Sequence, residues 1–165
     1  TLTVNQNSDS LTGTTSAAVV DGVATFSDLA IARAGTGYTF TIKADGLKSA
    51  TSAAFDVTTG PTAQLVFTRQ PSGGRATNTW WSQPIVTVED AFGNVVVTSV
   101  DAVSLQLTPT SGTANAVLVC AENPVVVVNG EARFSKCSID LAGDDYTVTA
   151  TSGPLSAVSE PFAIT

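Results

Sequence analysis

Histidine and methionine are absent from this 165-residue sequence, and only 13% of its residues are charged. Without histidine, neither a Ser-His nor a Cys-His nucleophilic pair can form. No glycine-rich phosphate loop precedes a helix pattern, and no apolar run approaches the roughly 18 residues that cross a bilayer. The sequence therefore predicts a protein that is not an enzyme, uses no cofactor and inserts in no membrane.

Basic residues are also scarce. Seven Lys and Arg residues stand against fourteen Asp and Glu residues, and the formal net charge is −7. Binding to nucleic acid requires clustered Lys and Arg to neutralise phosphates, and here these residues are scattered along the chain. The composition therefore excludes nucleic acid as a partner.

Valine and threonine are abundant, whereas the long straight-chain residues that favour helices are few. β-Branched residues lose side-chain freedom on a helix and fit a pleated sheet well. Short stretches with alternating apolar residues, such as Val103–Leu107 and Phe162–Ile164, are typical of strands with one buried face. These features predict an all-β protein.

The chain contains an internal repeat. Val19–Ser27 recurs as Val127–Ser135, and twelve of the twenty-five positions from Val19 to Lys43 are identical to those 108 residues later. Residues 62–101 have no counterpart upstream. We therefore expect residues 1–58 to be the C-terminal part of one domain, 59–61 to be a linker, and 62–165 to be a complete domain.

Each copy contains a dipeptide that predicts a tight hairpin. Asp21-Gly22 and Asn129-Gly130 supply the two positive φ angles that a type I′ turn requires. About seven short strands in a domain of about 100 residues suit two packed sheets. The sequence predicts tandem β-sandwiches, of which the first lacks its N-terminal strands.

Such an incomplete sandwich would leave sheet edges and an apolar face uncovered. We expect the open edges near residues 1–5 and 38–43. Two alternatives follow: another subunit lends the strands that complete the first copy, or the chain is a piece of a longer polypeptide.

Two runs of residues resemble a known family. They are Gly22-x-Ala24-x-Phe26-x-x-Leu29-x-Ile31 with Ala34-Gly35-x-Gly37-Tyr38, and Val86–Val96 (VTVEDAFGNVV). Both resemble bacterial immunoglobulin-like repeats of the invasin/intimin type, which occur in surface adhesins and S-layer-like proteins. The resemblance covers nearly the whole chain.

The resemblance implies tandem immunoglobulin-like sandwiches in an extracellular surface protein. Such repeats act mostly as spacers, so we expect a structural unit of a stalk, fibre or coat. Its partners would be neighbouring repeats or identical subunits in a homopolymer, assembled into a filament by strand complementation. The alternative is an adhesin or carbohydrate-binding module that contacts glycans through an exposed tryptophan.

Cys120 and Cys137 are the only cysteines, and they flank the Asn129-Gly130 turn. Cys137 occupies the position that Leu29 holds in the first copy, so we expect it to point into the core. A disulfide between the two cysteines would suit an extracellular protein. The alternative is a pair of free core thiols in a reducing compartment.

Acidic residues fall in two groups, one around Asp90 and Asn94 and the other around Asp144 and Asp145. Calcium takes six to eight oxygen ligands, commonly from alternating positions of one loop, and neither group has that spacing. We expect Asp90 and Asn94 instead to cap a turn through bonds to the backbone. The sequence predicts no metal site, and these four residues are the candidates if calcium binds.

Trp80 and Trp81 are adjacent. Neighbouring residues of a strand point to opposite faces, so we expect one indole in the core and the other outside. An exposed indole could stack on a sugar ring or contact another subunit. The alternative is that it packs against the linker or a preceding domain.

Overall fold

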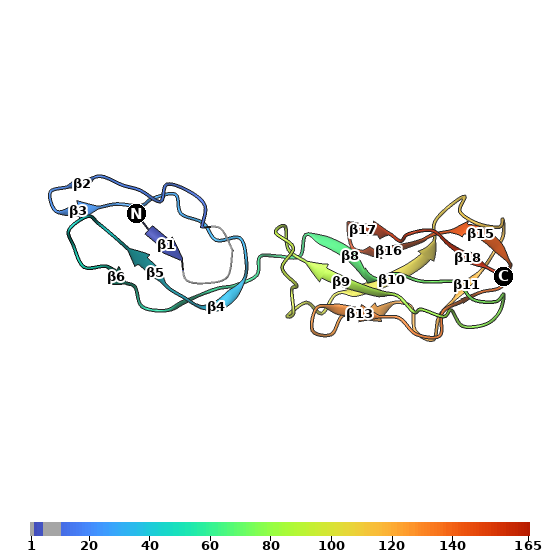
Figure 1. The fold of residues 1–165 in the computed structure, drawn as a ribbon. Helices are drawn as coiled ribbons and strands as arrows, with labels where there is room; N and C mark the ends of the chain where they lie inside the picture. The colour runs from blue at the N-terminus through green and yellow to red at the C-terminus, as the bar shows by residue number, and fades with distance from the viewer. Residues whose placement is uncertain (1, 5–10) are drawn as a thin grey trace. The chain divides into compact units, whose positions relative to one another are not determined.

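The computed structural model describes residues 2–4 and 11–165, and these residues form strands and turns without any helix. The predicted all-β class is thereby confirmed. The chain divides into two compact units, Thr1–Thr59 (unit 1) and Gly60–Thr165 (unit 2). Each unit has its own sheets (Figure 1).

Unit 1 contains three small antiparallel sheets. Their strand orders are β1-β5-β6, β2-β3 and β4-β7. The strands are β1 (Leu2–Val4), β2 (Val19–Val20), β3 (Val23–Ala24), β4 (Gly35–Tyr38), β5 (Phe40–Ile42), β6 (Ala50–Thr51) and β7 (Phe55–Val57).

Unit 2 contains two larger sheets, with the orders β12-β10-β16-β17 and β13-β9-β8, and the pairs β11-β14 and β15-β18. The strands are β8 (Gln64–Arg69), β9 (Ile85–Glu89), β10 (Ala102–Leu107), β11 (Leu118–Val119), β12 (Val125–Val126), β13 (Glu131–Arg133), β14 (Ser138–Ile139), β15 (Gly143–Tyr146), β16 (Val148–Ser152), β17 (Leu155–Val158) and β18 (Phe162–Ile164).

The two larger sheets of unit 2 enclose one hydrophobic core. Val86 and Val88 enter it from β9, and Val103 and Leu105 enter it from β10. β9 lies between β8 and β13 (Figure 1), and four consecutive residues, from Ile85 to Val88, are buried. Thr87 in this run is also buried, and its hydroxyl shares a hydrogen bond of 2.8 Å with that of Thr68, so the strand is buried on both faces.

The two hairpin turns have the geometry that their dipeptides favour. The φ angles are 49° and 79° at Asp21 and Gly22, and 52° and 80° at Asn129 and Gly130. The first turn joins β2 to β3, and the second leads into β13. Asparagine, aspartate and glycine tolerate these left-handed angles better than other residues.

The two units repeat the same pairings. Tyr38 faces Phe55 across β4 and β7, as Tyr146 faces Phe162 across β15 and β18, and each pair of strands has a register irregularity. The Tyr38 hydroxyl donates to the carbonyl of the residue five positions earlier at 3.0 Å, and the Tyr146 hydroxyl does the same at 2.9 Å. The sequence repeat is therefore also a repeat of local structure.

The register fixes where unit 1 begins within this repeat. Val4 pairs with Phe40, as Leu107 pairs with Val148. Phe40 and Val148 are 108 residues apart, so β1 corresponds to the end of β10. Among the described residues of unit 1, none corresponds to β8 or β9.

One expectation about the open edges is wrong. Residues 38–43 include β5, which pairs with β1 on one side and with β6 on the other. β1, in the region of residues 1–5, pairs with β5 alone among the described strands, and β3 pairs with β2 alone. The prediction for residues 38–43 failed because β1 and β6 occupy both sides of β5. The strand β3 corresponds to β13, whose partner in unit 2 is β9.

The buried tyrosine hydroxyl offers a test of this fold. We expect Tyr146→Phe to lower the free energy of unfolding of unit 2 by about 1 kcal/mol, because the hydrogen bond to the Leu141 carbonyl is lost. Urea unfolding followed by tryptophan fluorescence measures this, since both tryptophans lie in unit 2. Tyr38→Phe is the matched control in unit 1 and should leave the fluorescence transition in place. An unchanged midpoint in Tyr146→Phe would contradict the assigned bond.

Candidate functional site

The predicted disulfide joins Cys120 and Cys137 across the hairpin that contains Asn129. Cys137 is fully buried in the core of unit 2, and Cys120 packs against that core. A bridge over a loop of this length stabilises the folded state by about 3 kcal/mol on the loop-entropy model. The described part of the chain has no free cysteine, and a disulfide is typical of proteins in oxidising compartments.

Asp90 is the buried carboxylate of unit 2, with 1% of its surface exposed. It accepts hydrogen bonds from the backbone N–H groups of Gly60, Phe92 and Asn94 at 2.9–3.0 Å. The Asn94 side-chain amide also donates to it, at 2.9 Å to Oδ2. The carboxylate thus holds the turn after β9 and ties the first residue of unit 2 to it.

These bonds change the acidity of Asp90. Burial works to raise the pKa of the carboxyl group, but hydrogen bonds from Asn94, Gly60 and Phe92 outweigh burial and lower the pKa from 3.8 to about 2. Hydrogen bonds of this kind favour the charged form. Asp90 and Asn94 therefore act as the turn cap that was the alternative to calcium binding.

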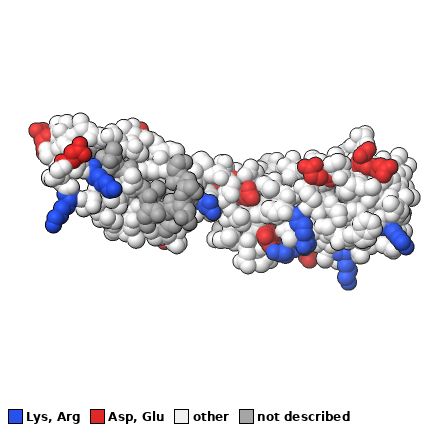
Figure 2. Space-filling view, viewed as in Figure 1, with Lys and Arg blue, Asp and Glu red and all other residues white. Residues whose placement is uncertain are grey.

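The other calcium candidates lie apart from this turn in the sequence. Asp144 and Asp145 are exposed residues of β15, between Gly143 and Tyr146, where the register with β18 shifts. Asp145 has a positive φ of 59°. Over residues 2–4 and 11–165, no group of three or more Cys, Asp or Glu side chains is placed to share a metal ion. Acidic and basic side chains lie scattered over the face shown in Figure 2.

The two tryptophans lie in different environments. Trp80 is 3% exposed and meets Phe162 edge-on, with 5.1 Å between ring centroids, so it is unavailable as a contact for a ligand or a subunit. Trp81 is 76% exposed. It borders an open hollow of about 690 Å³ together with Arg75, Thr77, Asn78 and Thr79. Of the two indoles, Trp81 is therefore the one that can contact a ligand.

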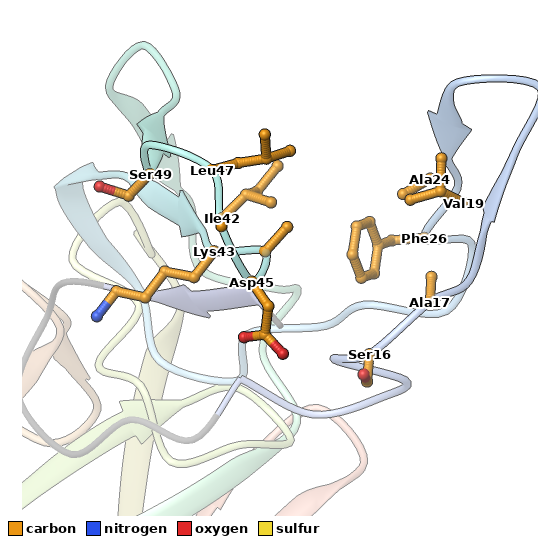
Figure 3. A pocket seen from close by; sticks show the side chains of 12 residues that line it. Ser16, Ala17, Val19, Ala24, Phe26, Ile42, Lys43, Asp45, Leu47 and Ser49 are labelled. Atoms are coloured by element: carbon orange, nitrogen blue, oxygen red, sulfur yellow. The ribbon is translucent and has the colours of Figure 1, made fainter.

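Unit 1 contains a groove that sequence reasoning did not locate, and both apolar residues and polar ones such as Lys43 and Asp45 line it. Its volume is about 800 Å³. Figure 3 shows Val19, Ala24 and Phe26 on one wall, facing Ile42 and Leu47 on the other. Of these, only Phe26 is even half-buried. The signal that could have found the groove is the alignment of β3 with β13, whose neighbour in unit 2 is β9.

A second hollow of unit 1 has a volume of about 410 Å³. Leu29, Ile31, Phe55 and Val57 line it. In the repeat, these positions correspond to Cys137, Ile139, Phe162 and Ile164, all of which are buried in the core of unit 2. Apolar side chains that are enclosed in unit 2 are therefore accessible in unit 1.

No protein-family model and no curated protein matches the chain. Among solved structures, a glycosyl hydrolase family 2 member from Bacteroides cellulosilyticus is similar, at 14% sequence identity and a TM-score of 0.49. The likeness covers 78% of this chain and 17% of that protein. The chain thus spans less than a fifth of the protein it resembles, and so distant a likeness carries no functional argument.

No helix long and apolar enough to cross a membrane occurs in the described part of the chain.

The Asp90 turn predicts a pH dependence of stability. Above about pH 4 the carboxylate is charged in both states and its bonds stabilise unit 2, whereas towards pH 2 the unfolded chain takes up a proton first and that contribution is lost. We expect Asp90→Asn to unfold at lower temperature than the unmodified chain at pH 7, because an amide nitrogen cannot accept the bonds made to Oδ2. The difference should shrink as the pH falls to 2.

Thermal unfolding measured at several pH values between 2 and 7 checks this prediction. Asp144→Asn is the control, because Asp144 is exposed and outside the turn. A deficit in Asp90→Asn that stays constant with pH would show that the carboxylate is not the source of the stability.

Proposed function

We propose that this chain is a structural repeat unit of an extracellular bacterial surface protein, built from tandem immunoglobulin-like sandwiches in a stalk, fibre or coat. The observation that carries the proposal is the repeated pairing of Tyr38 with Phe55 and of Tyr146 with Phe162, with a tyrosine hydroxyl bond in each unit. A chain that repeats one framework of strands is suited to spacing and stacking.

The chemistry of the chain supports a structural role over catalysis. The sequence has no histidine to act as a general base. The buried acid Asp90 has its oxygens engaged by four donors within its own unit. The Cys120–Cys137 disulfide supports an extracellular location, because disulfides persist in oxidising compartments.

The partners in this proposal are neighbouring repeats or identical subunits. The observation in favour is the open edge of β3, which carries the exposed Val23. An exposed apolar edge strand is a template for pairing with another chain. Assembly by strand complementation would cover it and build a filament.

Light scattering on the full chain tests assembly. We expect the apparent mass to rise with concentration, and Val23→Lys to abolish the rise, because a lysine on an edge strand opposes strand addition. Val158→Lys is the matched control, since Val158 is an exposed valine on β17, an edge strand of unit 2. A chain that stays monomeric at every concentration would contradict self-assembly.

A carbohydrate-binding function is the second candidate, and the hollow beside Trp81 favours it. The exposed indole offers a flat apolar face, while Arg75 and Asn78 offer hydrogen-bond donors. This combination of stacking and polar contacts suits a sugar ring. Trp80 takes no part in this candidate, because it lies in the core.

A glycan array probed with the full chain tests the second candidate. If Trp81 stacks on sugars, Trp81→Ala should lose about tenfold or more in affinity for any glycan that binds, since a stacked aromatic contributes about 1.5 kcal/mol. Phe92→Ala is the control, because Phe92 is equally exposed at another loop. An array without a single bound glycan, or equal loss in both variants, would rule this function out.

A further inference from the structure

The hairpin turn of unit 2 carries an exposed asparagine, Asn129, directly before Gly130, and this dipeptide occurs once in the chain. An asparagine loses its side-chain amide when the backbone nitrogen of the next residue attacks the side-chain carbonyl carbon. Glycine allows the closest approach, because it has no Cβ to obstruct the attack. The geometry of the turn then decides whether the two groups can meet.

The peptide group between Asn129 and Gly130 is free to rotate. Neither the Asn129 carbonyl nor the Gly130 N–H has a hydrogen-bond partner among the described residues. The hairpin is held on either side of this peptide, since Val128 and Glu131 exchange two backbone bonds, at 2.9 and 3.1 Å. The Gly130 carbonyl accepts from the Val88 N–H at 2.9 Å. The central peptide can therefore rotate while the hairpin stays closed.

Rotation of this peptide brings the reacting atoms together. The φ angles of 52° at Asn129 and 80° at Gly130 belong to a type I′ turn. A flip of the central peptide gives a type II′ turn, in which the first central residue keeps its positive φ and takes a ψ of about −120°. At that ψ the Gly130 nitrogen lies on the same side as the Asn129 side chain, as closure of a five-membered ring requires. Glycine accepts either sign of φ, so the flip adds little strain at Gly130.

From this geometry we infer that Asn129 is a site of spontaneous modification, converted to aspartate and isoaspartate through a cyclic imide with the Gly130 nitrogen. The nitrogen bonds to Cγ of Asn129 and gives up its proton, the bond from Cγ to the amide nitrogen breaks, and ammonia leaves. Water then opens the ring. Opening at Cγ gives aspartate, whereas opening at the main-chain carbonyl carbon leaves the chain linked through Cγ, which is isoaspartate. The reaction consumes water and needs no oxidant.

The repeat shows that the aspartate product fits this turn. Asp21-Gly22 holds the same position in unit 1, with φ angles of 49° and 79°. Aspartate in place of Asn129 therefore keeps the hairpin. Its carboxylate makes the formal net charge of −7 one unit more negative.

The isoaspartate product does not fit. It adds one atom to the main chain between Val128 and Gly130. Gly130 has no room to shift, because it packs so closely on Val95 that even a Cβ would clash. We expect this product to lose the bond from the Val88 N–H to the Gly130 carbonyl. The pairing of β13 with β9 is then weakened at this end.

The test is incubation of the full chain at several pH values, followed by peptide mapping with mass spectrometry. We expect Asn129 to lose ammonia at a rate that rises with pH, because the attacking nitrogen must give up its proton, and isoaspartate to be among the products. Asn115 is the control within the same molecule. It is exposed and has a positive φ of 64°, but it precedes Ala116, whose N–H donates to the Thr113 carbonyl at 3.2 Å. Asn129 should react about tenfold or more faster, because the Cβ and the hydrogen bond of Ala116 obstruct the attack.

A synthetic peptide of residues 127–133 (VVNGEAR) measures the same reaction without the hairpin. Since rotation of one peptide suffices, the folded chain should react within about tenfold of the rate of the peptide. The isoaspartate form, separated by ion exchange, should exchange the Val88 N–H about fivefold faster than the unmodified chain, because it loses one hydrogen bond. Asn129→Asp is the matched variant and should exchange this N–H as the unmodified chain does.

Four results would overturn the inference: no loss of ammonia at Asn129, equal rates at Asn129 and Asn115, reaction of the peptide without reaction of the folded chain, or a product that is aspartate alone. The last would mean direct hydrolysis by water, without the Gly130 nitrogen. Unchanged exchange of Val88 in the isoaspartate form would overturn the expected effect on β9 and β13. The reaction needs only the folded hairpin of unit 2, so it does not depend on the proposed structural role.

Discussion

The pairing of β9 with β13 closes the core of unit 2, and the other features of that unit depend on it. Val86 and Val88 reach the core from β9, and Ala132 lies opposite Val86. With β9 in place, Phe134 and Tyr146 are fully enclosed. Unit 1 repeats the framework without a described counterpart of β9, and Tyr38 is its one buried apolar side chain among the described residues. Among the described residues, the closed core therefore occurs where β8 and β9 are present, and the open groove occurs where neither has a counterpart.

Polar contacts fix the loops around this core. Gln83 joins Trp80 to Cys137 through its side-chain amide, at a point where the backbone itself forms no continuous ladder. The Asp90 carboxylate accepts hydrogen bonds from the backbone of the turn after β9, and the disulfide holds Cys120 against the core. The hydrogen bonds of Gln83 and Asp90 satisfy polar groups that would be costly to bury alone. Together they hold the loops of unit 2 against its core.

Much of this arrangement could be predicted from particular residues. Valine and threonine content gave the all-β class, and the spacing of the cysteines around Asn129-Gly130 gave the disulfide. The Asp-Gly and Asn-Gly pairs gave the positions of the hairpin turns. Open edges were predicted near residues 1–5 and 38–43. The second prediction was wrong, since β5 is paired on both sides, because strand neighbours depend on register, which the apolar pattern of a short strand does not specify. The immunoglobulin-like arrangement and the surface role stay predictions.

The sequence by itself determined the repeat, its phase and the kinds of side chain available, because identities at a fixed spacing need no coordinates. Only the tertiary structure decided which tryptophan is buried, which carboxylate is enclosed, and where unit 1 is open. Those outcomes depend on contacts between residues far apart in the chain, such as Trp80 with Phe162 and Gly60 with Asp90. Such contacts follow from how sheets pack, and local sequence carries no record of them.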